Sequence, residues 1–250
     1  MKYFAKIRYF GRDFCGFQVQ PNLRTVQGEL NIAAEKLFEC PCKITGCSRT
    51  DSGVHANEFC ITIEATKEGA PTIPADKLAK AFSTVLPPDL SLYEASIVPD
   101  DFHPRYDAKG KEYVYIVYNA EVTNPFCTDR AWQIQRKITD EGLSRMQMAA
   151  KHFIGKNDFS AFMSAGSDVS DTVRTVFDFS VERKGDEVVF SVSADGFLYN
   201  MVRIMVGTLV QVAFKNIEPD EIENIIKGKK RYGAGMTAPP DGLYLNRVFY

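Results

Sequence analysis

The stretch of sequence that decides between a membrane protein and a globular one is residues 197–214, Phe-Leu-Tyr-Asn-Met-Val-Arg-Ile-Met-Val-Gly-Thr-Leu-Val-Gln-Val-Ala-Phe. The run is almost continuously apolar, but it has only 18 residues and contains Asn200, Arg203 and Gln211. An arginine near the middle of a membrane span is costly. We therefore interpret the run as a helix buried inside a globular protein, with Arg203 facing a group that compensates its charge.

The segments around this run alternate between strand-like and helix-like patterns. Just before it, two strand-like stretches flank Lys184-Gly185-Asp186 and predict a β-hairpin. Thr139 is a good N-cap for an amphipathic helix. For this half of the chain we expect strands at residues 111–119, 132–135, 173–183, 187–193 and 243–250, and helices at residues 139–154, 197–214 and 219–227.

The earlier half of the chain shows the same alternation. Thr25 is a plausible N-cap, and Pro74 stands where a helix can start. We expect strands at residues 1–10, 43–47, 58–65 and 91–98, and helices at residues 25–38 and 75–86. This is the element count of two ferredoxin-like α+β units side by side, so we predict an α+β fold with a central, mainly antiparallel sheet. Because residues 99–107 interrupt the pattern, we predict two α+β domains, residues 1–103 and residues 104–250.

Composition narrows the class of protein further. Of the 250 residues, 45% are hydrophobic and 25% charged, which is typical of globular chains. The net charge of −2 excludes a uniformly basic nucleic-acid coat but allows a local basic groove. Residues 1–10 lack the apolar region of a signal peptide, so the six cysteines predict reduced thiols in the cytoplasm. A zinc site at Cys40, Cys42, Cys47 and Cys60 is the lesser alternative, because paired C-x2-C knuckles are absent.

The loop most suited to chemistry is Gly46-Cys47-Ser48-Arg49-Thr50-Asp51-Ser52-Gly53-Val54-His55-Ala56, which lies between two predicted strands. It brings together a carboxylate, a guanidinium, hydroxyls and an imidazole, and loops held on rigid strands often carry function. The simplest interpretation is a turn in which Asp51 bonds its own backbone. A nucleophilic Ser48 with His55 as its base is a second possibility, but nothing identifies a third group to orient the imidazole.

Asp51-Ser52-Gly53 also matches the aspartic protease signature D-[ST]-G. That chemistry requires two carboxylates that share a proton. A second signature is absent from the sequence, because Asp171-Thr172 is followed by Val173, although a homodimer could supply the partner. A neighbouring Arg49 would also oppose a shared proton.

Arg203 suggests another role for the same loop. A guanidinium on a buried helix needs a carboxylate partner. If that partner is Asp51, the ion pair keeps the carboxylate ionised, as a carboxylate nucleophile must be. Tyr113, in a strand of the other half, offers a flat face for stacking. Its alternative role is that of a core or cross-strand aromatic, which we expect for Tyr115 and Tyr118.

The motifs resemble the tRNA pseudouridine synthase A (TruA) family, and they follow the family's order over essentially the whole chain. The Asp51 loop followed by Asn-Met-Val-Arg is highly specific, whereas Gly-Leu-Tyr-Leu alone is weak. The matching segments are residues 46–56, Phe102-His103-Pro104-Arg105, Lys111-Glu112-Tyr113-Val114-Tyr115, Phe197-Leu198-Tyr199-Asn200-Met201-Val202-Arg203 and Gly242-Leu243-Tyr244-Leu245. Three residues depart from the family pattern. Ser48 stands where the family usually has Gly or Ala, Ser52 stands where it usually has Ala, and Phe17 replaces a frequent Trp.

The resemblance implies an isomerase that converts uridine to pseudouridine at tRNA positions 38, 39 and 40, in the anticodon stem-loop. It implies that Asp51 is the catalytic aspartate, Tyr113 the active-site tyrosine and Arg203 the arginine paired with Asp51. Arg49 then corresponds to the family arginine beside the target base. The site would lie in the cleft between the two halves. The resemblance also implies a homodimer without a metal or other cofactor.

Affinity for RNA would come from basic residues along its backbone. The candidates are Arg12, Arg24, Arg105, Lys109, Lys111 and the run Lys227-Gly228-Lys229-Lys230-Arg231, which is equally well interpreted as a solvated helix end. We expect the acidic residues, such as Asp220, Glu221 and Glu223, to gather elsewhere. The rival function is a non-catalytic RNA-binding module of ferredoxin-like fold, although its aromatic-rich signature is absent.

Overall fold

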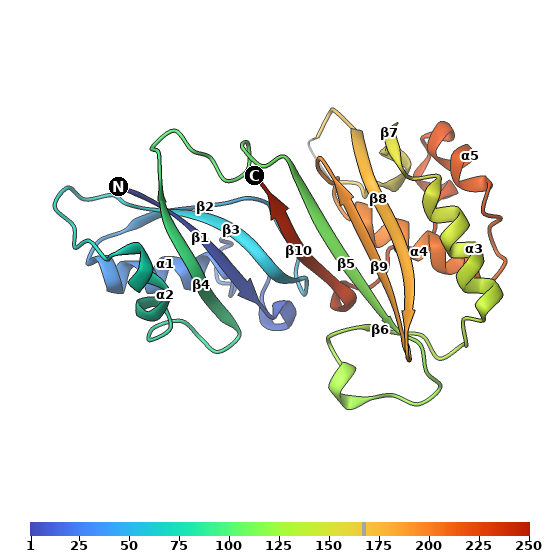
Figure 1. Cartoon of the computed structure of the whole chain (residues 1–250), viewed down its shortest axis with the longest axis horizontal. Helices are drawn as coiled ribbons and strands as arrows, with labels where there is room; N and C mark the ends of the chain where they lie inside the picture. Colours follow the sequence, from blue (N-terminus) through green and yellow to red (C-terminus); the bar gives the residue numbers. More distant parts are fainter. Residues whose placement is uncertain (167–168) are drawn as a thin grey trace. The chain divides into compact units, whose positions relative to one another are not determined.

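The computed structural model describes residues 1–166 and 169–250, and the chain forms an α+β fold (Figure 1). It divides into two compact units. The first unit comprises Met1–Lys109 together with Tyr244–Tyr250, and the second comprises Gly110–Leu243. Each unit contains a mixed β-sheet, and the described residues form five α-helices.

The sheet of the first unit has the strand order β4-β1-β3-β10, and β2 also pairs with β3. Strand β3 is long enough to hold two neighbours on the same edge: β2 pairs with its last residues, and β10 runs parallel to its first two. The loop between β2 and β3, residues 47–54, therefore joins β3 at the end where β10 pairs with it. The elements are β1 (Lys2–Tyr9), α1 (Val26–Phe38), β2 (Cys42–Gly46), β3 (His55–Ala65), α2 (Ala75–Phe82), β4 (Leu90–Val98) and β10 (Leu243–Phe249).

The core of this unit lies between the sheet and the two helices. Alternate residues of β1, including Ala5 and Ile7, are buried, as strand periodicity requires. They share this core with apolar residues of α1 such as Leu30 and Phe38. Helix α1 begins where the sequence predicts, because the Thr25 side chain accepts a hydrogen bond from the Gly28 amide.

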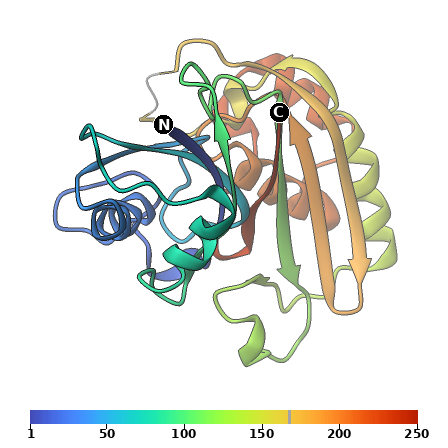
Figure 2. The same cartoon turned by 60° about the vertical axis from the view of Figure 1, so that its left-hand side comes forward.

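The sheet of the second unit has the order β5-β9-β8-β7, and the short strand β6 runs parallel to β5. Helices α3 and α4 cover one face of this sheet (Figure 2). Thr139 caps α3 by accepting a hydrogen bond from the Gly142 amide. The elements are β5 (Gly110–Tyr118), β6 (Trp132–Gln133), α3 (Asp140–Lys151), β7 (Gly155–Asp158), β8 (Val173–Lys184), β9 (Glu187–Ala194), α4 (Met201–Ala213) and α5 (Glu221–Gly228).

Helix α4 occupies most of the apolar run at residues 197–214. Every residue of the helix is buried except Arg203 and Gln211, which confirms a buried helix inside a globular unit. The helix begins only at Met201, because Asn200 has a left-handed backbone conformation (φ 59°) and interrupts the run. Within residues 1–166 and 169–250, no helix has both the length and the hydropathy needed to cross a membrane.

Most predicted elements are confirmed, with small shifts at their ends. Strand β3 begins at His55, three residues earlier than expected, and α2 ends at Phe82 because the next residues form tight turns. Strand β7 was not predicted. The final strand, β10, packs in the first unit, whereas the sequence division placed it in the second domain. The two-domain division itself stays a prediction, because compactness does not show that either unit folds alone.

Candidate functional site

Asp51 stands at the first position of a tight turn. The Val54 amide donates to the Asp51 carbonyl over 3.2 Å. Gly53 occupies the third position with φ 80°, a left-handed conformation that a type II turn requires there and that glycine adopts easily. The simplest interpretation of the loop, a turn, is thus confirmed for its backbone. The Asp51 side chain is half-buried.

A single segment of chain, residues 9–17, holds this turn in place. The Tyr9 and Thr50 hydroxyl oxygens lie 2.7 Å apart in a buried hydrogen bond. On the other side of Asp51, the Phe14 carbonyl accepts from the Gly53 amide at 3.3 Å and from the Ser52 hydroxyl at 3.3 Å. Asp51 is therefore flanked on both sides by residues that are bonded to the same segment.

Two glycines allow this segment to approach the turn closely. A Cβ atom on Gly11 would lie 2.0 Å from the Val54 carbonyl oxygen, and one on Gly16 would lie 2.7 Å from the Thr50 carbonyl oxygen. Gly16 also has φ 82°. Backbone packs directly on backbone here, so main-chain contacts position the turn in addition to the hydroxyl bonds of Thr50 and Ser52.

Arg24 stabilises residues 9–17 through its contact with the Phe14 ring. Its guanidinium donates to both carboxylate oxygens of Asp89, at 2.7 and 2.9 Å, and to Glu29 at 2.9 Å. Its carbon Cζ lies 4.2 Å from the centre of the Phe14 ring. The hydrogen bond to Asp89 raises the pKa of Arg24 above its usual value. The Arg24 guanidinium is thus occupied by two acids, which gives it a structural role, and its predicted contact with RNA stays a prediction.

His55, directly after the turn, is a buried group. Its side chain is 1% exposed and its ring is stacked between Phe10 and Tyr244, with centroid distances of 4.7 and 4.6 Å. Its Nδ1 accepts the Gly11 amide at 2.8 Å. The structure thus gives this imidazole a packing role in place of the predicted role as a base for Ser48.

The departures from the family pattern also have structural roles. Phe17 is buried and stacks on Phe59 with ring centroids 4.4 Å apart, so it is a core residue of the first unit. A Cβ atom on Gly46 would lie 2.6 Å from the Phe17 ring, which explains a glycine at the end of β2. Ser52 uses its hydroxyl to bond the Phe14 carbonyl.

In the second unit, Tyr113 lies on β5 opposite Val192 of β9. Its side chain is 7% exposed, and its ring meets Phe197 edge to face at 5.1 Å. Tyr115, two residues further on the same face, is fully buried and donates to the Pro239 carbonyl at 2.7 Å. The prediction that Tyr115 is a core aromatic is confirmed.

Arg203 lies in the first turn of α4 and is half-buried, less than the sequence predicts. Its Nε donates to the Ala238 carbonyl at 2.7 Å, and one terminal nitrogen donates to the Asn200 side-chain oxygen at 2.7 Å. The Ala238 amide in turn donates to the Arg203 carbonyl at 3.1 Å. These bonds fix the plane of the guanidinium, and neither of them was predicted from the sequence.

The chain that follows Ala238 wraps around Tyr115. Burial raises the pKa of Tyr115 above its usual range; the nearby Arg203 guanidinium opposes this rise, and the Asp241 carboxylate adds to it. A Cβ atom on Gly242 would lie 2.7 Å from the Tyr115 ring, so glycine is required there. The weak Gly-Leu-Tyr-Leu motif therefore has two packing functions, Gly242 against Tyr115 and Tyr244 against His55.

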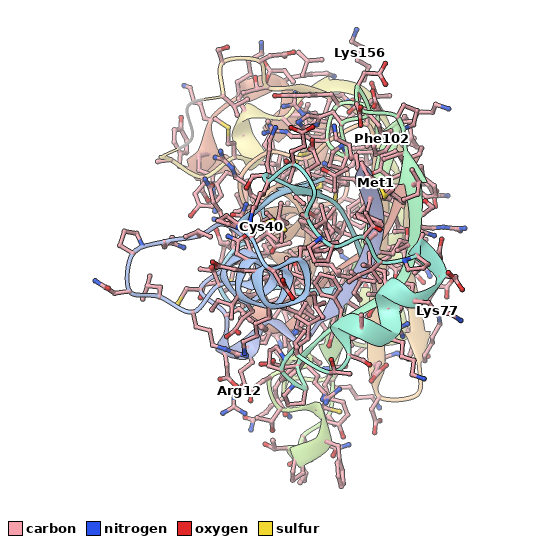
Figure 3. The ribbon with its side chains drawn as sticks, turned by 90° about the vertical axis from the view of Figure 1, so that its left-hand side faces the viewer. Met1, Arg12, Cys40, Lys77, Phe102 and Lys156 are labelled. Carbon is pink, nitrogen blue, oxygen red and sulfur yellow. The ribbon has the colours of Figure 1, made fainter. Side chains whose placement is uncertain are left out.

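The candidate RNA-binding cations differ in how they are placed. Arg49, Arg105 and Lys109 are exposed and Lys111 is half-buried, and the guanidinium of Arg105 lies 5.8 Å from the centre of the Tyr106 ring. The Arg12 side chain lies on the surface of the first unit (Figure 3).

Internal partners hold most of the basic run at the end of α5, residues 227–231. Lys229 pairs with Asp158 at 2.8 Å, and this bond holds the pKa of Asp158 well below its usual range. Lys227 pairs with Glu223 at 3.1 Å, and Arg231 donates to the Gly235 carbonyl at 2.8 Å. The expected separation of acidic from basic residues is therefore wrong for this helix.

The predicted catalytic residues belong to different units. Asp51 and Arg49 are in the first unit, and Tyr113 and Arg203 are in the second. The pairing of Asp51 with Arg203 stays a prediction. In the part of the chain that the structure describes, no three or more His, Cys, Asp or Glu side chains are grouped as metal ligands would be. The six cysteines, all of which lie in that part, are free thiols.

Comparison with known proteins places the chain in a family. The tRNA pseudouridine synthase family model matches residues 5–107 and 149–250, which is most of the chain. Relatives named tRNA pseudouridine synthase A come from Acetivibrio thermocellus (43% identical, covering 98% of this chain and 97% of the relative) and Halalkalibacterium halodurans (39% identical, covering 97% and 90%).

Among solved structures, a Cbf5–Nop10–Gar1 complex resembles the chain weakly, with 14% identity and a TM-score of 0.36 over 98% of this chain and 58% of that one. The sequence matches are far stronger. The regions of this chain that match the family model and the relatives cover the Asp51 turn and the start of α4. The chain belongs to the tRNA pseudouridine synthase family.

Proposed function

We propose that this protein converts uridine to pseudouridine at positions 38, 39 and 40 of the tRNA anticodon stem-loop, with Asp51 as the catalytic carboxylate. The observation that carries the proposal is the Asp51 turn, which backbone hydrogen bonds join to residues 9–17 on both sides, from the Phe17 amide to the Thr50 carbonyl and from the Gly53 amide to the Phe14 carbonyl. Preorganised geometry of this kind is what a group needs when it must act on a substrate at a fixed position. The family relationship supports the same assignment.

The reaction breaks the bond between N1 of uracil and C1′ of ribose and forms a bond between C5 and C1′. The proton on C5 is lost and N1 gains one, so the product is an isomer of the substrate. An ionised carboxylate is required whether Asp51 attacks the ribose or the base. The target nucleotide lies in a stem or a tight loop, so it must flip out of the stack to reach Asp51.

Arg203 and Tyr113 complete the proposed site. We expect the Arg203 guanidinium to pair with Asp51 and keep it ionised. The Arg203 guanidinium donates to two neutral acceptors, the Ala238 carbonyl and the Asn200 side-chain oxygen. Tyr113 would stack on the flipped uracil and assist removal of the proton from C5. Arg49 would lie beside the target base.

The remaining parts of the proposal concern the assembly. Arg105, Lys109 and Lys111 would contact RNA phosphates, which position the substrate without reading its sequence. We expect each of the two halves to be ferredoxin-like, with the last strand, β10, belonging to the first half. The protein would act as a homodimer in the cytoplasm and need no cofactor.

The test is incubation of the protein with unmodified tRNA that carries tritium at C5 of uridine. An isomerase releases the tritium as the C5 bond to hydrogen breaks, and sequencing of the product locates pseudouridine at positions 38–40. Tight binding without release would instead support the rival function, a non-catalytic RNA-binding module. Release from other positions would overturn the assignment to the anticodon stem-loop.

A further inference from the structure

We propose that His55 is a positioning residue for the Asp51 turn, an inference that rests on the proposed function of Asp51. His55 is the first residue of β3 and follows directly after Val54, which closes the turn. Its imidazole joins the turn to two other parts of the first unit that are distant in sequence, the segment after β1 and the start of β10.

Stacking and a hydrogen bond together orient the ring. Its centroid lies 4.7 Å from that of Phe10 with an interplanar angle of 20°, and 4.6 Å from that of Tyr244 with an angle of 26°. The residue is 1% exposed. The two nearly parallel neighbours restrict tilting of the ring, and the hydrogen bond at Nδ1 specifies which way its nitrogen atoms point.

The fixed ring directs Nδ1 at the Gly11 amide, 2.8 Å away. Because the amide donates this hydrogen bond, Nδ1 carries no proton and the ring is the neutral tautomer with its hydrogen on Nε2. Gly11 is the residue whose backbone packs on the Val54 carbonyl, so closely that a Cβ atom would lie 2.0 Å from the oxygen. The bond from Gly11 to His55 therefore holds the main chain against the end of the turn.

The same contact extends to the other side of the turn. The Phe14 amide donates to the Gly11 carbonyl at 3.0 Å, and the Phe14 carbonyl accepts from Gly53 and Ser52. A shift of Gly11 would be transmitted through this short 3-10 helix (η1, Gly11–Asp13) to the residues beside Asp51. His55 thus acts on the Asp51 carboxylate through backbone contacts. This role does not require His55 to touch the substrate.

The alternative is an ordinary core residue that contributes only to stability. The two roles differ in what the side chain must supply. A phenylalanine could also stack between Phe10 and Tyr244, whereas only an acceptor at the Nδ1 position satisfies the Gly11 amide. Asparagine places an oxygen near that position, and glutamine places its amide near Nε2. These variants separate stacking from hydrogen bonding.

The experiment measures single-turnover isomerisation, tRNA affinity and thermal stability for His55→Phe, His55→Asn and the control Tyr3→Phe. Tyr3 is buried in the same unit, and its hydroxyl donates to the Ile73 carbonyl and accepts from the Ile73 amide, so we expect the loss of this hydroxyl to lower stability alone. We expect His55→Phe to lose about 10-fold to 100-fold in rate with tRNA affinity within about twofold of wild type. His55→Asn should recover most of the rate, and Tyr3→Phe should keep all of it.

A His55→Phe rate within about twofold of wild type, or no advantage of asparagine over phenylalanine, would overturn the proposal. Should His55→Phe fail to fold, His55→Gln replaces it, and equal rates for the Asn and Gln variants would overturn the proposal. Hydrogen exchange at the Gly11 and Gly53 amides gives a readout that does not depend on activity. If the wild-type protein does not isomerise uridine, the proposed function fails. The positioning contact is still tested in that case. Faster hydrogen exchange at the Gly11 and Gly53 amides in His55→Phe than in Tyr3→Phe supports it, and equal exchange contradicts it.

Discussion

The Asp51 turn and the start of α4 each present one charged side chain, but they hold it in different ways. The turn is held by main-chain atoms: Gly11 and Gly16 pack against it, and Phe14 bonds its backbone. Arg203 is held by its own side chain, which donates to Ala238 and Asn200. A substitution of Asp51 should therefore leave its surroundings in place, whereas a substitution of Arg203 removes bonds that join α4 to its neighbours.

The largest effect is expected for Asp51→Asn. The amide has nearly the shape of the carboxylate but is a poor nucleophile, so we expect pseudouridine formation to fall more than about 1,000-fold. Stability and tRNA affinity should stay close to wild type, because the amide keeps the size and shape of the carboxylate and the backbone bonds of the turn are unchanged. The control Asp101→Asn changes an exposed aspartate of the same unit and should keep full activity. Residual activity of Asp51→Asn within tenfold of wild type, about 1.4 kcal/mol, would remove Asp51 from the catalytic role.

Arg203→Ala should affect both activity and stability. We expect a rate loss of at least about 100-fold and a decrease of about 1–3 kcal/mol in the free energy of unfolding, because two hydrogen bonds of a charged group disappear. Arg145 provides the control, since its guanidinium also donates to two carbonyl groups, those of Val212 and Ile217, and in addition pairs with Glu218 at 3.0 Å. Arg145→Ala should lose similar stability and keep its rate. Equal rate losses in the two variants would show that Arg203 is merely structural.

Gly11→Ala tests the backbone packing directly. The new methyl group would meet the Val54 carbonyl oxygen, so we expect about 3 kcal/mol of destabilisation, measured by denaturant unfolding, and a smaller rate loss than for Arg203→Ala. Gly228→Ala is the control, because a Cβ atom there has open space around it. That variant should be as stable as wild type or slightly more stable. A Gly11→Ala protein of wild-type stability would contradict the close approach.

The smallest effect is expected from the exposed cations. Replacing Lys109 and Lys111 by alanine should weaken binding of all tRNAs about equally. It should also reduce the slope of log affinity against log salt by about 1 for each phosphate that is no longer neutralised. The control replaces Lys227 and Lys229, which pair with Glu223 and Asp158, and should leave the slope unchanged. The same slope in wild type and in the Lys109 and Lys111 variant would remove these lysines from the RNA path.

Local patterns in the sequence were enough to predict most elements of both units. Thr25 and Thr139 cap the helices they were expected to cap, because an N-cap depends only on residues three positions apart. Strand β7 was missed since its four residues, Gly155–Asp158, are polar and show no alternation. The position of β10 beside β3 was also missed, because pairing between strands about 190 residues apart leaves no local signal.

The candidate site was predictable as a set of residue types and not as a set of contacts. The motif around Asp51 identified the loop, and the single arginine in an apolar run identified Arg203. The sequence could not show that Arg24 is occupied by Asp89 or that His55 stacks on Tyr244. Both contacts join segments that are far apart in the chain. The identity of a charged or aromatic residue does not indicate which distant residue it will contact.

The most direct test of the central claim, that Asp51 and Arg203 act as one pair, is a crystal structure of the protein bound to an anticodon stem-loop RNA. We predict an Asp51 carboxylate oxygen within about 4 Å of an Arg203 guanidinium nitrogen, the distance of an ion pair. We also predict a flipped uracil stacked on the Tyr113 ring. A separation too large for a bridging water, with the uridine still in its stack, would contradict the claim.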